Sequence, residues 1–271
     1  MPESIVPQQG MGLYVHVPFC ATKCPYCDFN TYAGIETLIP GYVDALNTEM
    51  EVWGELLGRP RVSTVFFGGG TPSLMRPDTV DRVIRAARSA WGFTNAIEIT
   101  LEANPGTVEA GRFAGFREAG INRLSIGVQS FNNTHLQALG RIHDASAAIQ
   151  AAHQAREAGF TSFNLDIMHA LPGQTRAQAL DDLQQAMALQ PTHLSWYELT
   201  IEPNTVFFRS PPDQPSPAHM ADTEQEGFAL LASQGYQRYE VSAFARDGHA
   251  CRHNLNYWQF GDYLGIGAGA H

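Results

Sequence analysis

Apolar, β-rich runs alternate along this chain with segments of helical spacing, and this alternation constrains the fold more than any other feature. The six apolar runs are 13–17, 62–67, 97–101, 123–128, 162–167 and 193–199. The segments of helical spacing are 41–57, 77–90, 108–119, 145–158 and 176–189. This order predicts an α/β fold of parallel strands joined by right-handed crossovers. We expect a partial TIM-like barrel of six β/α units, with a doubly wound sheet as the competing topology.

The alternation stops after residue 199, and a proline-rich loop follows at 210–217. A helix is predicted at 218–233, before a polar and aromatic stretch at 236–263. The glycine-rich end, 263–271, resembles a strand that stops before it is complete, so we interpret the C-terminal extension as truncated. The predicted divisions are a loose tail at 1–11, a core at 12–205 and an extension at 206–271.

The composition is that of a globular protein and disfavours both a nucleic-acid-binding protein and a membrane-spanning one. Hydrophobic residues make up 44% of the 271 residues, which is enough to build a substantial core. The formal net charge of −10 disfavours a large nucleic-acid footprint, so we expect no nucleic-acid partner. No signal peptide precedes the first strand, and no apolar run reaches the ~18 residues of a membrane span. We therefore expect a cytoplasmic protein without an integral membrane segment, and the composition leaves its oligomeric state unassigned.

Three of the four cysteines lie within eight residues, directly after the first apolar run. Cys20, Cys24 and Cys27 can ligate three irons of a [4Fe-4S] cluster and leave the fourth iron open to a ligand. The alternative is a zinc knuckle closed by Cys251 or a histidine, but zinc sites usually pair two C-x₂-C elements and no second pair exists here. The spacing favours the iron-sulfur cluster, and the clustered thiols indicate a reducing compartment.

Polar residues and glycines end the other predicted strands. Gly68-Gly69-Gly70-Thr71-Pro72 exposes backbone N–H groups to a ligand, or forms a simple tight turn. Four polar residues end the following strands: Glu102, Gln129, Asp166 and Glu198. Each alone is more often a hydrogen-bonded structural group. In a parallel barrel all of them reach the rim where active sites assemble, which predicts a ligand site there.

The chain resembles the radical S-adenosylmethionine (SAM) superfamily, and within it the oxygen-independent coproporphyrinogen dehydrogenase-like group. The C-x₃-C-x₂-C loop and Gly-Gly-Gly-Thr-Pro carry the first resemblance. The second rests on four motifs: Tyr-Val-His-Val-Pro-Phe-Cys from Tyr14, Leu-Glu-Ala-Asn-Pro from Leu101, Arg-Leu-Ser-Ile-Gly-Val-Gln-Ser-Phe from Arg123, and Leu-Gly-Arg-Ile-His from Leu139. The resemblance spans residues 12–271 and implies a (β/α)6 radical SAM barrel.

The resemblance also implies site residues. Cys20, Cys24 and Cys27 would ligate the cluster, with the amino and carboxylate groups of SAM on the open iron. The residues that would contact SAM are Tyr14, Tyr26, Gly69, Gly70, Thr71, Glu102, Gln129, Arg141 and Asp166. In the dehydrogenases some of these contacts belong to a second SAM molecule, and the sequence does not decide whether this chain has that site.

Two features point to the haem-chaperone branch, HemW. The dehydrogenases carry a further cysteine two residues after the third, where this chain has Phe29. His253-Asn-Leu-Asn-Tyr257-Trp258 matches the branch motif H-N-x-x-Y-W. His253 would be an axial haem ligand, and the two aromatic residues would pack on the porphyrin. The alternative is an aromatic cluster at a sheet end with His253 hydrogen-bonded internally. A strand through His249, Cys251 and His253 would place all three on one face, as a metal site or, more often, around a buried thiol.

The resemblance implies a cytosolic chaperone that binds haem and passes it to an acceptor protein. The alternative is a coproporphyrinogen III dehydrogenase, which forms protoporphyrinogen IX through a 5′-deoxyadenosyl radical, so enzyme activity stays open. A radical enzyme acting on tRNA is a weaker third possibility that the acidic charge disfavours.

Overall fold

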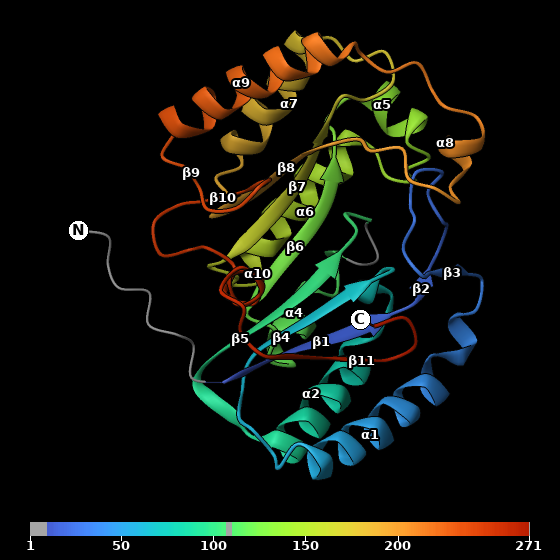
Figure 1. Ribbon diagram of the computed structural model, residues 1–271, viewed down its shortest axis with the longest axis vertical. Coiled ribbons are helices and arrows are strands. Elements are labelled where there is room, and N and C mark those ends of the chain that lie inside the picture. Colours follow the sequence, from blue (N-terminus) through green and yellow to red (C-terminus); the bar gives the residue numbers. More distant parts are fainter. Residues whose placement is uncertain (1–9, 107–109, 271) are drawn as a thin grey trace.

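A nine-stranded sheet organises the chain in the computed structural model, which describes residues 10–106 and 110–270 (Figure 1). Its order is β11-β1-β4-β5-β6-β7-β8-β10-β9. The six central strands are parallel: β1 (Met11–Val17), β4 (Val62–Gly69), β5 (Phe93–Ala103), β6 (Arg123–Gln129), β7 (Phe163–His169) and β8 (His193–Glu198). Because these six follow one another in chain order, the sheet is a partial barrel, and the doubly wound alternative is wrong.

The C-terminal residues extend both edges of the sheet. β11 (Tyr263–Ile266) pairs in parallel with β1. β10 (Ala243–Ala245) runs antiparallel to β8, and β9 (Gln237–Arg238) runs antiparallel to β10. A separate two-stranded sheet joins β2 (Phe19–Cys20) to β3 (Tyr32–Ala33). The strands of the extension, residues 206–271, belong to the same sheet as the strands of the core, residues 12–205. The predicted domain boundary near residue 205 therefore stays a proposal.

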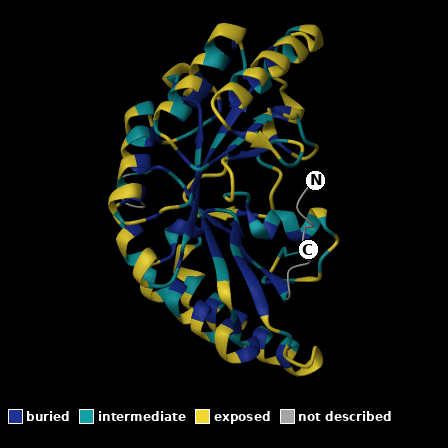
Figure 2. Ribbon diagram, turned by 90° about the vertical axis from the view of Figure 1, so that its left-hand side faces the viewer, coloured by how far each residue is buried: buried dark blue, intermediate teal, exposed yellow. Residues whose placement is uncertain are grey.

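The long helices pack on the outer, convex face of the sheet, as Figure 2 shows by their exposed outer surfaces, whereas α10 (Arg252–Trp258) lines the inside of the barrel. The other α-helices are α1 (Ile39–Leu56), α2 (Pro77–Trp91), α4 (Phe113–Glu118), α5 (Asn133–Ala138), α6 (Ala145–Glu157), α7 (Arg176–Ala188), α8 (Val206–Arg209) and α9 (Pro217–Ser233). Two 3₁₀ turns are η1 (Glu36–Leu38) and η2 (Pro72–Leu74). Within the described residues no helix is both long and apolar enough to cross a bilayer.

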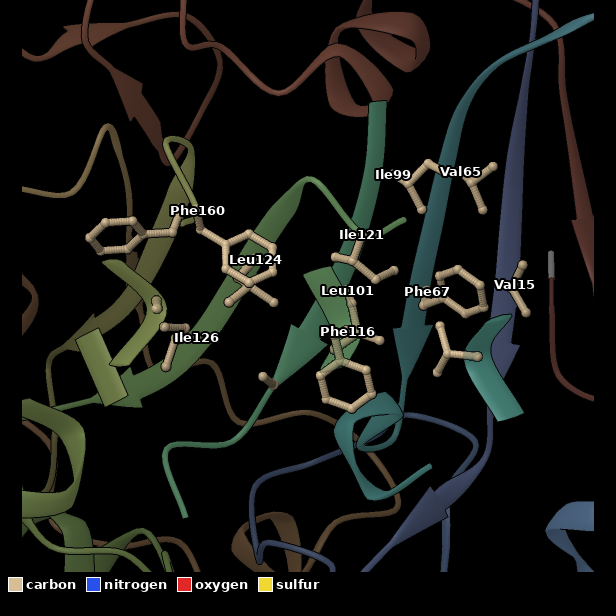
Figure 3. Packing of buried hydrophobic residues seen from close by; sticks show 14 of the residues in the cluster. Val15, Val65, Phe67, Ile99, Leu101, Phe116, Ile121, Leu124, Ile126 and Phe160 are labelled. Carbon is tan, nitrogen blue, oxygen red and sulfur yellow. The ribbon is translucent and has the colours of Figure 1, made fainter. Parts of the chain in front are cut away.

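Alternation along the strands separates an apolar face from a polar one. Val15, Val65, Phe67, Leu101 and Ile126 point towards the helices and are fully buried (Figure 3). The residues between them face the inside of the barrel and include many polar groups: Thr64, Thr100, Arg123, Ser125, Asn164, Asp166, His193 and Ser195. The apolar face supplies the hydrophobic stabilisation, and the polar face lines the interior.

His249, Cys251 and His253 do not lie on one strand. Helix α10 begins after its N-cap Cys251, so the arrangement in which a strand would place these three side chains on one face does not occur. Glu98 causes this, because its carboxylate accepts hydrogen bonds from the backbone N–H groups of Arg252 (3.2 Å) and His253 (3.1 Å).

At the glycine-rich end, the predicted strand forms as β11, and the chain turns at Gly267, whose N–H donates to Glu49. His271 and residues 1–9 of the predicted tail lie outside the described residues, and Met11 already belongs to β1.

We predict that Gly227→Ala destabilises the protein although alanine is the better helix former. Gly227 lies in α9 against the buried indole of Trp196, and a Cβ there would meet ring atoms at 1.9 Å. Overpacking should lower the free energy of unfolding by about 2 kcal/mol. In the matched control Gly41→Ala, in α1, the new Cβ meets nothing within 4 Å, and stability should rise by up to about 1 kcal/mol. Urea unfolding measures the free energy of unfolding of both variants. Equal changes in the two variants would contradict the close packing of Gly227 against Trp196.

Candidate functional site

The carboxyl ends of the parallel strands surround a cavity of about 470 Å³, which we call the upper cavity. The cysteine loop, the glycine-rich loop and the rim of β5–β8 line it. Of the nine predicted SAM residues, eight lie in its wall: Tyr26, Gly69, Gly70, Thr71, Glu102, Gln129, Arg141 and Asp166. Tyr14 is the exception, because it lies lower in the barrel interior, where its hydroxyl pairs with Nδ1 of His16 at 3.0 Å.

Cys20, Cys24 and Cys27 all line the upper cavity as free thiols. The loop that carries them turns through a hydrogen bond from the N–H of Cys27 to the carbonyl of Cys24 (3.1 Å). Thr71 donates its hydroxyl to the sulfur of Cys20, and Arg141 donates to the sulfur of Cys24, each at 3.7 Å. The loop thus places three sulfur atoms at the cavity wall, a set of ligands that suits an iron-sulfur cluster.

The side chains of the described residues form no ready site for a single metal ion. Across residues 10–106 and 110–270, no three histidine, cysteine or acidic side chains gather closely enough to share a single metal ion. A mononuclear zinc site requires four ligands around one ion, whereas the thiolates of a four-iron cluster each bind a different iron. Cys251, the remote candidate for closing a zinc knuckle, lines a different cavity and donates to Glu98.

The glycine-rich loop fits against the cysteine loop too closely to admit side chains. Gly70 donates its N–H to the carbonyl of Val17, and a Cβ on Gly70 would lie 2.5 Å from the carbonyl oxygen of Phe19. Gly69 has a φ of +108°, and its N–H donates to a carboxylate oxygen of Glu102 at 3.2 Å. The glycine-rich segment is therefore a tight turn, and the same turn brings its backbone groups to the cavity wall, where a ligand could contact them.

Arg141 connects the cysteine loop to the rim of the sheet. Its guanidinium donates to Oδ1 of Asn104 (2.6 Å) and to the carbonyl of Gly127 (2.9 Å), in addition to Cys24. Sequence reasoning missed Asn104 as a site residue, although it follows a strand end as Glu102 does. It also missed Tyr197, whose hydroxyl donates to Oε1 of Gln129 at 2.7 Å. Strand alternation in β8 could have identified Tyr197, since it lies two residues after the cavity residue Ser195.

Two buried carboxyl groups give the cavity floor its electrostatic character. Burial, and secondarily the charge of Asp166, raises the pKa of Glu102 to about 8. Burial also raises the pKa of Asp166, while hydrogen bonds from Ser125 and Asn164 oppose that change. At neutral pH Glu102 is therefore mainly protonated, and an entering cation would favour its ionisation.

The predicted haem residues lie away from the upper cavity. His253 and Tyr257 line a second, lower cavity of about 280 Å³ in the barrel interior, and Trp258 is half exposed at the end of α10. Nδ1 of His253 pairs with the Thr64 hydroxyl (2.8 Å) and Nε2 with the Tyr257 hydroxyl (3.0 Å). Burial lowers the pKa of His253 to about 4. The internal hydrogen bonding expected from the alternative interpretation is present, and axial ligation of haem would require one of these bonds to break.

We predict that Glu102→Gln changes the pH dependence of stability. Between the ordinary carboxyl pKa and about 8, the native state retains a proton that the unfolded chain has lost, so stability falls as pH rises. The wild type should lose up to about 1.4 kcal/mol per pH unit in this window relative to the variant. Thermal unfolding of the ligand-free proteins from pH 5 to 8.5 measures this, with exposed Glu118→Gln as control. Parallel curves for wild type and Glu102→Gln would contradict the assignment.

Comparison with protein families matches residues 14–186 to the Radical SAM superfamily. Among curated proteins, the chain is 48% identical over 266 residues to "Heme chaperone HemW" of Haemophilus influenzae, covering 96% of this chain and 70% of that protein. It is 49% identical to the protein of the same name from Escherichia coli, covering 96% of this chain and 69% of that protein. A mitochondrial radical SAM domain-containing protein 1 of Bos taurus is 42% identical, with 62% of its length covered.

Among solved structures, the chain resembles the E. coli coproporphyrinogen III oxidase HemN, a radical SAM enzyme, with a TM-score of 0.84 and 30% identity. The match covers 98% of this chain and 65% of that one. The family match, the partial barrel and the cysteine loop agree with one another. The chain belongs to the radical SAM superfamily and, within its HemN-like group, to the family of the HemW proteins.

Proposed function

We propose that this protein is a haem-binding chaperone built on a radical SAM core, which binds haem and transfers it to an acceptor protein. The sustained identity of 48–49% to curated haem chaperones, over 96% of the chain, carries this proposal. We place its activity in the cytoplasm, in keeping with the clustered free thiols. The acceptor protein and the oligomeric state are left unassigned.

The loop position that separates the two branches supports the chaperone. Phe29 stands where the dehydrogenases have a cysteine, and its ring is exposed at the wall of the upper cavity. An exposed aromatic side chain there offers a contact for an apolar ligand or partner rather than a fourth thiolate. The structural similarity to HemN keeps oxidative decarboxylation of coproporphyrinogen III as the second candidate function.

The upper cavity is the proposed site of the cluster and SAM. Cys20, Cys24 and Cys27 would hold a [4Fe-4S] cluster, which supplies an open iron for the amino and carboxylate groups of SAM. Tyr26 would pack against the adenine region, and the N–H groups of the glycine-rich loop would meet the methionyl end. The residues proposed for the remaining cofactor contacts are Glu102, Gln129, Arg141 and Asp166. Tyr14, which lies close to Gly68 and interacts electrostatically with Glu102, is also proposed to contact SAM.

The proposed haem contacts lie on α10. Trp258 offers an exposed aromatic surface next to Tyr257, and these two rings would pack on a porphyrin face. His253 would serve as axial ligand after its bond to the Tyr257 hydroxyl opens. Its low pKa suits this role, because only a neutral imidazole can bind iron.

We predict that Cys24→Ser abolishes cluster binding and Cys251→Ser does not. Anaerobic reconstitution of the wild type should give roughly four irons and four sulfides per chain, and Cys24→Ser should retain almost none. Cys251 is the matched control, because it is a buried free thiol that lines the other cavity. Iron, sulfide and zinc analysis decides the matter. Tight zinc binding to colourless wild-type protein would overturn the cluster proposal.

We predict stoichiometric haem binding that weakens about tenfold in Trp258→Ala, since an aromatic face contributes on the order of 1 kcal/mol or more to such packing. Titration with haem, followed by its visible absorption, measures the affinity. Phe208→Ala, which removes an equally exposed ring from α8, is the control and should leave it unchanged.

Two results would count against the chaperone. Failure of the wild type to bind haem removes the proposal directly. Formation of protoporphyrinogen from coproporphyrinogen, in anaerobic incubation with SAM and reductant, would establish the dehydrogenase in its place.

A further inference from the structure

The lower cavity lies inside the barrel beneath the proposed SAM site. It shares Glu102, Ser125, Asp166 and Ser195 with the wall of the upper cavity, and α10 covers its outer side. Its volume of about 280 Å³ is just below the range that accommodates drug-sized ligands. A small molecule, or one arm of a larger one, is therefore the size of ligand to consider.

Arg123 is the residue that marks this cavity as a binding site. It stands at the start of β6, its side chain points into the barrel, and only 3% of its surface is exposed. Its Nε is buried without a hydrogen-bond partner, and the guanidinium forms no ion pair with any described residue. A buried cation is costly unless it is paired, so this guanidinium is available to an anion.

The neighbouring polar groups are engaged with one another. Nδ1 of His193 pairs with Asn164 (2.7 Å) and its Nε2 with the Tyr239 hydroxyl (2.8 Å). Glu98 accepts hydrogen bonds from Cys251 and from the first N–H groups of α10, so its carboxylate caps that helix instead of pairing with Arg123. Among these hydrogen-bonded side chains, the guanidinium of Arg123 lines the cavity with its Nε unpartnered.

The described acidic groups near Arg123 attract it without forming an ion pair. Burial acts to lower the pKa of Arg123, but the nearby Cys251, Glu98 and Asp166 outweigh this effect and raise it. Glu102 is mainly protonated at neutral pH, and burial raises the pKa of Asp166, which accepts hydrogen bonds from Ser125 and Asn164. Glu240, at the edge of the cavity, accepts the N–H of Ser242 at 3.0 Å. A protonated carboxyl group can also donate a hydrogen bond to an anion.

We propose that the lower cavity binds a carboxylate group and that Arg123 is the residue that receives it. A guanidinium matches a carboxylate through two parallel N–H···O bonds, and the low-dielectric interior strengthens such a pair. The carboxylate belongs either to a small free acid or to the propionate arm of a porphyrin whose ring lies outside the cavity, next to α10. The second source rests on the proposed function.

Thermal unfolding in sodium propionate, at constant ionic strength adjusted with sodium chloride, tests the inference. Propionate should stabilise the wild type in a saturable way, and its apparent dissociation constant should rise at least tenfold in Arg123→Gln. Arg123→Lys keeps the positive charge but cannot form two parallel hydrogen bonds to a carboxylate. Its apparent dissociation constant for propionate should lie between those of the wild type and Arg123→Gln. Arg117→Gln, an exposed arginine on α4, should behave as the wild type.

A purely structural role for Arg123 gives a different result. Without propionate, Arg123→Gln should unfold at a lower temperature than the wild type, because it removes the attraction of the guanidinium to Glu98 and Asp166, so the response to propionate is the deciding measurement. A lower unfolding temperature with an unchanged response to propionate would overturn the inference, as would equal stabilisation of both proteins. If Arg123→Gln does not fold, the comparison of wild type with Arg123→Lys applies, and equal propionate affinities would overturn it.

Haem and haem dimethyl ester distinguish the two sources of the carboxylate. If a propionate arm enters the cavity, the wild type should bind haem about tenfold more tightly than its ester, and Arg123→Gln should bind both equally. If the ligand is a small free acid, haem and ester bind alike while propionate still depends on Arg123. Failure of the wild type to bind haem at all would count against the proposed function, and the propionate result would stand independently.

Discussion

Two main-chain hydrogen bonds hold the cysteine loop at the rim of the barrel. The N–H of Gly70 donates to the carbonyl of Val17, and the N–H of Thr71 donates to the carbonyl of Phe19, each at 2.7 Å. These bonds continue the pairing of β1 with β4 beyond the strand ends, so the position of the thiols follows from the register of the sheet. Loss of glycine at position 70 would break this connection, because no side chain fits there.

The same sheet has two chemically different faces. Its outer face is apolar and packs on the helices, while its inner face presents histidines, amides, carboxyl groups and one arginine to two adjoining cavities. Glu102 lies in the walls of both cavities, and its burial raises its pKa to about 8. The protonation state of this one carboxyl group therefore sets the local charge in both cavities. A ligand in either cavity can thus alter the electrostatic environment of the other.

Much of the fold could be predicted from the sequence, because parallel strands between amphipathic helices produce a strong periodic signal. The same logic predicted that Glu102, Gln129 and Asp166 meet at one rim. Tyr14, which only the family resemblance singles out, lies three residues before the end of β1 and lines the lower cavity.

Other features depend on contacts between distant parts of the chain. Residues 252–258 carry no clear helical period, and Glu98, some 150 residues earlier, caps them as α10. Arg123 opens a predicted strand, where a charged residue would ordinarily be expected at the surface. Only the curvature of the sheet and the position of α10 bury it. The short strands β9 and β10 are likewise too brief for any period to reveal, whereas β11 lies in the glycine-rich end where the sequence predicts a strand.

The central claim is that three thiolates leave one iron of the cluster open to SAM. Electron paramagnetic resonance of the reduced, reconstituted protein tests it most directly, with spectra recorded before and after addition of SAM. The account predicts the signal of a reduced [4Fe-4S] cluster, whose g-values shift on addition because SAM binds the open iron. A reduced-cluster signal that SAM leaves unchanged, or no such signal in iron-loaded protein, would contradict it.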